Sequence, residues 1–344
     1  MSDRHGRALG ALTGLALGDA LGMPTQSMSR EEIARRYGRV TTLLPAVADQ
    51  PIAPGMPAGS VTDDTEQALL LARLLVDGGG RVEPEVFAKA LVDWEADMIR
   101  RGSADLLGPS TKRALEALQA GVSADEAGRW GTTNGAAMRV TPIAIASRPD
   151  RAALLDAVAD TSRVTHNTGL GLAGAAAIAG AVSAGIEGAD LGEALDEAEQ
   201  AAAAGARRGH WSAGGDIATR IRWARGWVRG LGRAELADVL CEVIGTSVAA
   251  QESVVAAVAL ADALGGEPFE ALTLAAEIGG DTDTVAAMCG AILGAVHGAA
   301  VFPAELTEQV RQVNRLELEP LATALLALRE LPEPGGRHVH HTQH

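Results

Sequence analysis

Two short acidic segments, far apart along the chain, hold the residues best suited to chemistry. Residues 62–65 read Thr-Asp-Asp-Thr, and residues 281–284 read Asp-Thr-Asp-Thr. Carboxylates and threonine hydroxyls are the oxygen ligands that Mg²⁺, Mn²⁺ and Ca²⁺ prefer. If the fold brings the segments together, four carboxylates repel one another unless cations neutralise them. The pattern therefore favours a hydrolytic site with two divalent ions.

Each segment also has a purely structural interpretation. Asp63 and Glu66 have the spacing of a capping box at the start of a helix. Asp281 and Asp283 would suit the first turn of a helix, where the helix dipole favours negative charge. The near-duplicate pattern, with a Gly-Gly turn before the second copy, favours the metal site over both alternatives.

Composition restricts the class of protein and its partners. The chain has 344 residues, 47% of them hydrophobic, and a formal net charge of -15, as expected for a globular protein with a large core. The acidic charge argues against a nucleic-acid polymer or an anionic membrane as partner, because both bind basic surfaces. Cys241 and Cys289 each lie in an apolar helical run, so buried free thiols and a cytoplasmic location are expected.

Periodic apolar residues predict helices along nearly the whole chain, and alternating strand patterns are almost absent. We therefore predict an all-α fold, a compact multi-helix bundle in one domain over residues 1–331, with a flexible histidine-containing tail over 332–344. Residues 40–61 are rich in proline and glycine and predict a long loop of the kind that is often functional. The uncharged stretches 168–186 and 284–302 consist largely of Ala and Gly, so we expect them to pack between helices rather than to span a membrane. The predicted helices are 6–21, 30–37, 64–77, 84–101, 110–120, 123–128, 135–147, 150–163, 168–185, 190–204, 212–230, 233–245, 248–264, 267–277, 283–300 and 304–326.

Four segments, taken in order, identify a family. Residues 18–22 read Gly-Asp-Ala-Leu-Gly, residues 134–139 read Asn-Gly-Ala-Ala-Met-Arg, and the acidic segments follow Val61 and Gly280. These segments resemble the opening signature, the central segment and the two metal motifs of the ADP-ribosylglycohydrolases, the group that includes the dinitrogenase-reductase-activating glycohydrolase. The resemblance spans about residues 7–303, most of the chain.

The resemblance implies an all-α fold with a central cleft that holds two divalent cations, Mg²⁺ or Mn²⁺. A water bound to such an ion has a lowered pKa and is therefore a usable nucleophile at neutral pH. Its attack on the anomeric carbon would pass through an oxocarbenium-like state. We assign catalysis to Asp63, Asp64 and Asp283, with one of the first two orienting the water or accepting its proton. By motif match, the metal ligands would be Thr62, Asp63, Asp64, Asp281, Asp283 and Thr284.

Contacts with the substrate are assigned to Asp19, Asn134, Gly135, Ala136 and His166. Asn134 opens a predicted helix whose small residues and free N–H groups suit a phosphate, and a plain asparagine N-cap is the alternative. The resemblance suggests that His166 lines the nucleotide or ribose pocket, and a histidine satisfied within the core is the alternative. Asp19 lies between glycines at a helix end, where a packing or turn aspartate is the alternative.

Two further features bear on the substrate. Trp223 and Trp227 fall one helical turn apart and are predicted to be core residues rather than a platform for a base. Gln26 occupies the place where many members of the family carry a glutamate on a loop that gates the metal cleft. Glutamine is a poorer metal partner than a carboxylate, so this change concerns the substrate more than the fold.

The implied activity is metal-dependent release of ADP-ribose from an arginine-like protein side chain or from a small molecule. Two alternatives stay open: hydrolysis of a simpler N-ribosyl compound such as a nucleoside, and non-catalytic binding of ADP-ribose. The complete set of acidic residues argues against the binding module, whereas Gln26 keeps that alternative open. The expected partner is therefore an ADP-ribosylated protein or a small ribosyl compound.

Overall fold

The computed structural model describes residues 3–101 and 107–331. These residues form α-helices joined by loops; no β-strand lies among them, only two isolated bridges, so the all-α prediction is confirmed. The tail predicted over 332–344 lies outside the described residues. The helices are α1 Asp3–Gly22, α2 Arg30–Arg36, α3 Asp63–Asp77, α4 Pro84–Arg100, α5 Pro109–Gln119, α6 Ala124–Ala127, α7 Gly135–Met138, α8 Thr141–Ala146, α9 Arg151–His166, α10 Gly169–Ile186, α11 Leu191–Gly205, α12 Ile217–Val228, α13 Arg233–Val239, α14 Ala250–Leu264, α15 Pro268–Ala275, α16 Thr282–His297, α17 Ala304–Asn314 and α18 Leu318–Arg329.

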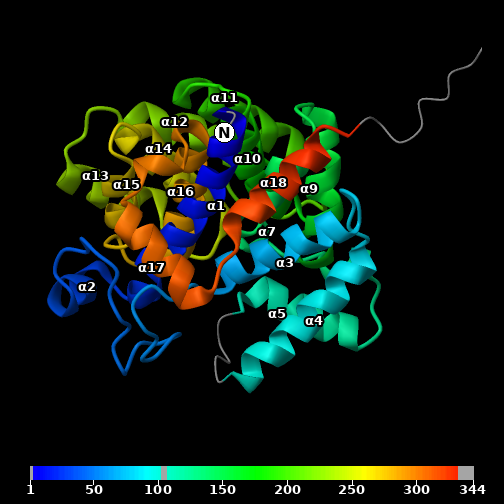
Figure 1. Cartoon of the computed structure of the whole chain (residues 1–344), viewed down its shortest axis with the longest axis horizontal. Helices are drawn as coiled ribbons and strands as arrows, with labels where there is room; N and C mark the ends of the chain where they lie inside the picture. The colour runs from blue at the N-terminus through cyan, green and yellow to red at the C-terminus, as the bar shows by residue number, and fades with distance from the viewer. Residues whose placement is uncertain (1–2, 102–106, 332–344) are drawn as a thin grey trace, which may run out of the picture.

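The helix pair α1 and α16 forms the centre of the molecule (Figure 1). Gly10, Gly14, Gly18 and Gly22 recur every four residues and so share one face of α1. A Cβ atom at Gly14 would lie 2.0 Å from the carbonyl oxygen of Gly290, so the two backbones approach this closely only because side chains are missing. The contacts run in opposite order along the two helices. The helices are therefore antiparallel, and the C-terminal end of α1 meets the N-terminal end of α16.

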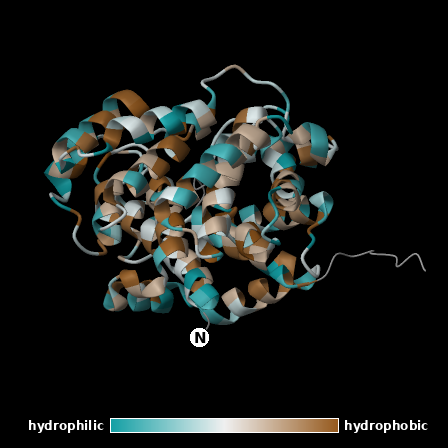
Figure 2. Ribbon diagram, turned by 90° about the horizontal axis from the view of Figure 1, so that it is seen from above, coloured by the Kyte–Doolittle hydropathy of each residue, from teal (hydrophilic) through white to brown (hydrophobic). Residues whose placement is uncertain are grey.

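Helix α10 is a second central element. It is long and apolar enough to cross a membrane by length and composition, but 83% of it is buried inside the protein, against α9, α11 and α16. A Cβ atom on Gly180 would approach the methyl group of Ala201 of α11 to 2.7 Å. Close packing between helices is thus the role of this stretch, as predicted. Figure 2 shows polar and apolar residues alternating along the helices at the periphery.

Several predicted helices are divided where the backbone must turn. The stretch 135–147 forms two short helices, because α8 begins with Thr141-Pro142 and proline cannot donate a hydrogen bond to the preceding turn. The stretch 304–326 is interrupted at Arg315, which has a left-handed conformation with φ of 54°. The helix predicted over 283–300 ends at His297, before Gly298. The helix predicted from 212 begins at Ile217.

The prediction that two tryptophans belong to the core is wrong. Trp223 and Trp227 are 42% and 41% exposed on α12. Their rings contact each other edge to face, with centroids 5.1 Å apart. Spacing by one helical turn placed them correctly beside each other, but the same spacing fits a paired surface patch as well as a buried stripe.

Candidate active site

The carboxylate of Asp19 ties the end of α1 to the start of α3. It accepts hydrogen bonds from the backbone N–H groups of Thr62 and Thr65 at 3.0 and 3.1 Å. It also accepts from both threonine hydroxyls, at 2.8 and 2.5 Å. The first N–H groups of a helix have no partner within that helix, so an aspartate from another helix caps α3 and fixes the first acidic segment.

The capping-box alternative for the first segment does not hold. The carboxylate of Glu66 accepts a hydrogen bond from Nε1 of Trp94 at 2.8 Å and pairs with Arg101 at 2.7 Å. It therefore points toward α4, and the side chain of the N-cap residue, Thr62, makes no capping hydrogen bond within α3. The aspartates of this first turn, Asp63 and Asp64, are not used in local capping.

A glycine turn fixes the second acidic segment. Gly280 has φ of 77°, a left-handed conformation that favours glycine, and a Cβ atom there would lie 2.4 Å from the carbonyl oxygen of Thr246. Its carbonyl accepts the N–H of Ser27 at 2.7 Å, and its own N–H donates to Met28 at 3.0 Å. The next N–H, that of Asp281, donates to Thr246 at 2.7 Å. The loop after α1 and the loop before α14 thus hold the start of α16.

The two acidic segments meet where α1, α3 and α16 converge. The hydroxyl of Thr284 donates to Asp64 at 3.3 Å, which joins one segment directly to the other. One carboxylate oxygen from each of Asp19, Asp64 and Asp283 lies within 4.8 Å of the other two. We call the five aspartates of this region, 19, 63, 64, 281 and 283, the acidic cluster.

Burial leaves the acidic cluster short of partners. Asp63, Asp64 and Asp283 are 7%, 0% and 2% exposed, and desolvation, followed by repulsion from neighbouring aspartates, raises the pKa of each well above its ordinary value. The Oδ1 atoms of Asp64 and Asp283 are buried and have no hydrogen-bond partner among the described residues. An ionised oxygen is costly to bury without a partner. Several carboxylates with threonine hydroxyls are a donor set that fits a hard divalent cation.

The raised pKa values predict how pH affects the cation-free protein. Folding keeps protons on carboxylates that are ionised in the unfolded chain, so the stability they contribute is lost as pH rises through the folded pKa. For Asp19, burial raises the pKa from 3.8 to about 6, which corresponds to about 3 kcal/mol. In EDTA, the stability that Asp19 contributes should therefore be lost between about pH 4 and 6. The pKa values of Asp63, Asp64 and Asp283 are also raised, so the melting temperature should keep falling above pH 6, where ordinary carboxylates are already ionised.

Mg²⁺ should reverse this loss of stability at high pH, because the bound cation replaces the protons on the buried carboxylates. The stabilisation by Mg²⁺ in thermal unfolding should be larger at the upper end of the pH range than at the lower end. A melting temperature in EDTA that is flat or rises with pH would show that the cluster does not hold protons when the cation is absent.

The central segment lies against the second acidic segment. The side-chain amide of Asn134 donates to Asp281 and, at 2.9 Å, to the hydroxyl of Ser253. Its side chain makes no capping hydrogen bond, so the plain N-cap alternative is wrong. The helix α7 that begins at Gly135 and includes Ala136 has only four residues, far shorter than the helix predicted there.

His166 is fully buried at the end of α9. Its Nδ1 lies 2.7 Å from the hydroxyl of Thr165, and its Nε2 lies 2.9 Å from that of Thr133. The ring packs on Gly135, where a Cβ atom would come within 2.9 Å of Cε1. Burial, with a smaller contribution from the positive charge of Arg139, holds the pKa of His166 well below its ordinary value. The ring is therefore neutral and hydrogen-bonded on both sides, next to the segment assigned to the substrate.

Two positioning contacts escaped sequence reasoning. The amide of Gln67 donates to Oδ2 of Asp63 at 3.4 Å, and its place one helical turn after that aspartate was a usable signal. Asn314, at the end of α17, donates to the carbonyl of Gly59 at 2.7 Å and accepts the N–H of Val61 at 3.1 Å. No local pattern marks Asn314, because its partners are far away in the chain.

The turn that holds Gln26 lies beside the second acidic segment. The side chain of Gln26 is 6% exposed and donates to the carbonyl of Met23 at 3.3 Å. Its backbone carbonyl accepts the amide of Gln50 at 2.9 Å. The long loop predicted over 40–61, which contains no helix, is thus tied to this turn.

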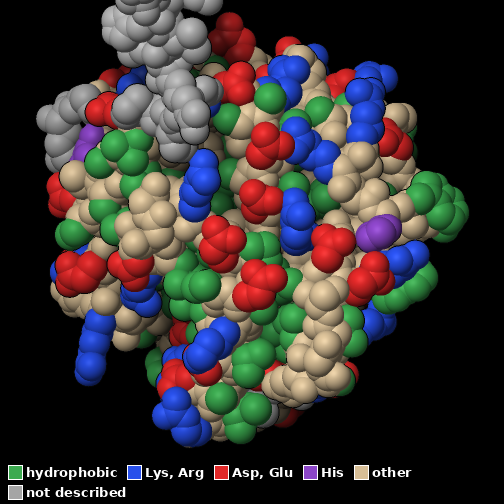
Figure 3. All heavy atoms as spheres, turned by 90° about the vertical axis from the view of Figure 1, so that its right-hand side faces the viewer, with side chains coloured by type: hydrophobic (Ala, Val, Ile, Leu, Met, Phe, Trp, Pro, Cys, Tyr) green, Lys and Arg blue, Asp and Glu red, His purple; other side chains and the backbone are tan. Residues whose placement is uncertain are grey.

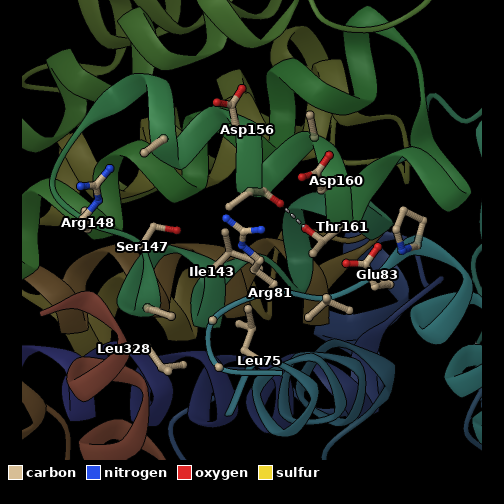
Figure 4. Close-up of a pocket in the computed structure, with 18 of the residues that line it drawn as sticks. Leu75, Arg81, Glu83, Ile143, Ser147, Arg148, Asp156, Asp160, Thr161 and Leu328 are labelled. Carbon is tan, nitrogen blue, oxygen red and sulfur yellow. Dashed lines mark hydrogen bonds between the residues drawn. The ribbon is translucent and has the colours of Figure 1, made fainter. Parts of the chain in front are cut away.

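A cavity of about 870 Å³ lies elsewhere, between the end of α3, α8, α9 and the end of α18. Figure 4 shows Arg81, Asp156 and Asp160 around it. Asp156 pairs with Arg208, and Asp160 pairs with Arg163 at 2.6 Å. Acidic and basic side chains are interspersed over this side of the molecule (Figure 3). None of the predicted site residues lines the cavity, so it is separate from the acidic cluster.

Comparison with known proteins agrees with the order of the motifs. Residues 1–335 match the family model described as ADP-ribosylglycohydrolase. The uncharacterized protein YegU of Escherichia coli (strain K12) is 35% identical over 329 residues, which cover 95% of this chain and 98% of that protein. The ADP-ribosylarginine hydrolase Tri1 of Pseudomonas putida (strain GB-1) is 29% identical over 311 residues, 88% of this chain and 74% of that protein.

A solved structure gives the same answer at the level of the fold. A chain described as an ADP-ribosylglycohydrolase-related protein complex superposes with a TM-score of 0.69 and 26% sequence identity, covering 96% of this chain and 100% of its own length. With the match over nearly the whole sequence and the all-α arrangement of the described helices, this protein belongs to the ADP-ribosylglycohydrolase family of glycosidic-bond hydrolases.

Proposed function

We propose that this protein hydrolyses the N-glycosidic bond between ADP-ribose and an arginine-like side chain of a modified protein, and that it requires two divalent cations, Mg²⁺ or Mn²⁺. The observation that carries the proposal is the pair of buried, unpartnered oxygens on Asp64 and Asp283, where the two acidic segments meet. Such oxygens suit a cation and have no evident structural purpose without one.

Both acidic segments contribute to the proposed cation site. The charge of the bound cations would offset the mutual repulsion that, after desolvation, raises the pKa of Asp63, Asp64 and Asp283. When bound, the cations would supply a water that is a usable nucleophile at neutral pH. The residues that would hold them are Thr62, Asp63, Asp64, Asp281, Asp283 and Thr284.

Asp63, Asp64 and Asp283 are the proposed catalytic carboxylates, and Asp63 is the best placed to accept a proton. It is slightly exposed, whereas Asp64 is not, so a water can reach it more readily. In the reaction, the bond from the anomeric carbon to the guanidine nitrogen breaks, the water oxygen bonds to that carbon, and the nitrogen receives a proton. The aspartate that removes the proton from the water must later release it.

The class of leaving group is inferred from the relatives. One relative carries the name ADP-ribosylarginine hydrolase, which supports a guanidine nitrogen as the leaving atom. We assign the substrate contacts to Asp19, Asn134, Gly135, Ala136 and His166. Asn134 is 5% exposed and touches Asp281, so this segment adjoins the proposed cation site.

The decisive test is release of ADP-ribose from ADP-ribosyl-arginine by the purified full chain in Mn²⁺ or Mg²⁺, with EDTA as control. We expect release that EDTA abolishes and added cation restores. Nucleosides serve as the second substrate panel, because a simpler N-ribosyl bond is the alternative. Turnover of nucleosides alone would replace the proposed substrate. Thermal stabilisation by ADP-ribose without any turnover would replace catalysis with binding.

A further inference from the structure

Arg139, the last residue of the central motif, is a buried cation without a carboxylate partner. It is 1% exposed, and its guanidinium donates to Oε1 of Gln67 at 2.8 Å and to Oγ1 of Thr165 at 2.6 Å. The Cζ atom of Arg139 lies 5.0 Å from the centre of the Phe87 ring. No carboxylate among the described residues forms an ion pair with it. Such burial is unfavourable, and it lowers the pKa of Arg139 to about 10.

Arginine can only donate hydrogen bonds, and this fixes the direction of the contacts on both sides. On one side, the oxygen of the Gln67 amide must face Arg139, so its NH₂ group must face Asp63, whose Oδ2 lies 3.4 Å away. The amide cannot flip without placing NH₂ against the guanidinium. Gln67 is therefore held as a donor toward an aspartate of the acidic cluster.

On the other side, Thr165 accepts from Arg139, so the proton of its hydroxyl is left for another acceptor. The Nδ1 atom of His166, 2.7 Å away, is the acceptor within reach in the described part of the chain. A neutral imidazole that accepts at Nδ1 carries its proton on Nε2. That proton is then donated to the hydroxyl of Thr133 at 2.9 Å, beside Asn134.

We infer that Arg139 is a positioning residue that directs one hydrogen-bond chain from Asp63 to Thr133 and holds His166 as the Nε2–H tautomer. This hydrogen-bond chain links the acidic cluster to Thr133, which precedes Asn134 in the segment assigned to the substrate. Its Asp63 end rests on the proposed function, because Asp63 is taken there as a cation ligand. Its His166 end does not, because the tautomer is a property of the protein alone.

The His166 end is tested by ¹⁵N NMR of the histidine rings in the cation-free full chain, with His166 assigned by loss of its signal in His166→Gln. We expect an unprotonated Nδ1 and a protonated Nε2. Thr165→Val removes the hydroxyl and should alter the tautomer, whereas Thr165→Ser should restore the wild-type signal. Thr161→Val is the matched control, because among the described residues the hydroxyl of Thr161 donates within its own helix, to the carbonyl oxygen of Ala157 at 2.9 Å.

The Asp63 end is tested by titrating Mn²⁺ into Gln67→Met by calorimetry. Methionine has a similar length but cannot donate to Asp63, and losing such an outer contact typically weakens metal binding by about 10-fold to 100-fold. An Mn²⁺ affinity equal to that of the wild type would overturn this end of the chain. A protonated Nδ1 in the wild-type spectrum would overturn the direction assigned through Arg139, even if Thr165→Val fails to fold. Either of these two results would overturn the hydrogen-bond chain without changing the release of ADP-ribose by the wild-type protein. Failure of the inference can therefore be distinguished from failure of the proposed function, which the release assay tests separately.

Discussion

Asp64→Asn should abolish cation-dependent turnover and at the same time make the cation-free protein more stable. The neutral amide removes a charge that burial and the neighbouring aspartates disfavour, as the raised pKa of Asp64 indicates. It also removes a charged oxygen from the proposed cation site. A bound cation contributes several kcal/mol to the transition state, and each 1.36 kcal/mol is a factor of ten in rate. The expected loss of turnover is therefore about a thousandfold or more.

Three measurements on the same variant check this expectation. Turnover of ADP-ribosyl-arginine should vanish, binding of Mn²⁺ by calorimetry should weaken sharply, and the melting temperature in EDTA should rise. Asp93→Asn is the matched control, because Asp93 is exposed on α4 and its ion-pair partner among the described residues is Lys89. Full turnover in Asp64→Asn, or a lower melting temperature in EDTA, would contradict the two-cation proposal. Asp63→Ala and Asp281→Ala should also lose turnover while keeping the helical circular dichroism signal.

The buried aspartates are expected to support turnover but to lower the stability of the cation-free protein. This conflict explains why the acidic segments could be recognised in the sequence. A protein without ligands gains nothing from several buried carboxylates within a few ångströms of one another. The residue types in both segments therefore indicated a cation before any fold was known. The structure adds the convergence itself, through the hydrogen bond of Thr284 to Asp64 and the proximity of Asp19 to both segments.

Asp19 shows what the sequence left undecided. Its place between two glycines near a helix end was compatible with a packing role or a substrate contact. The structure gives it four donors from the first turn of α3 and a place in the acidic cluster. These partners lie 43 and 46 residues away in the chain, so they depend on tertiary packing. Asn314 was missed because its partners are far away in the chain, whereas the spacing of Gln67 from Asp63 was a usable signal that the sequence analysis did not use.

Local backbone chemistry explains the errors in the predicted helices. Pro142 was visible in the sequence, and it forces the break between α7 and α8. Arg315 gave no such warning, because a left-handed arginine between α17 and α18 is set by packing and not by preference. Apolar periodicity, by contrast, identified nearly every other helix, because the inward face of each must be apolar.

The second large effect concerns the glycines of α1. Gly14→Ala should destabilise the protein by about 3 kcal/mol or more, because its Cβ would lie 2.0 Å from a backbone oxygen of Gly290 and overpacking of this kind forces backbone shifts. For a domain of this size, whose unfolding entropy is about 0.7 kcal/mol per kelvin, the melting temperature should fall by roughly 4 °C or more. A flexible side chain could move aside, but the backbone of α16 cannot do so without carrying its N-terminal end with it.

Gly6→Ala on the same helix is the matched control. A Cβ atom at Gly6 meets nothing within 4 Å, and alanine favours a helix over glycine by about 1 kcal/mol, so the control should be neutral or slightly stabilised. A Gly14→Ala protein as stable as the control would mean that α1 and α16 do not need backbone contact.

The same substitution should also reach the acidic cluster. Asp19 is on α1 and Asp283 is on α16, and both offer oxygens to one group within 4.8 Å. Separating the helices increases the distance between these two carboxylates without changing any residue of the cluster. Gly14→Ala should therefore bind Mn²⁺ more weakly than Gly6→Ala at temperatures where both are fully folded. Equal affinities would show that the loops around Gly280 and Asn134, rather than the helix pair, set the geometry of the cluster.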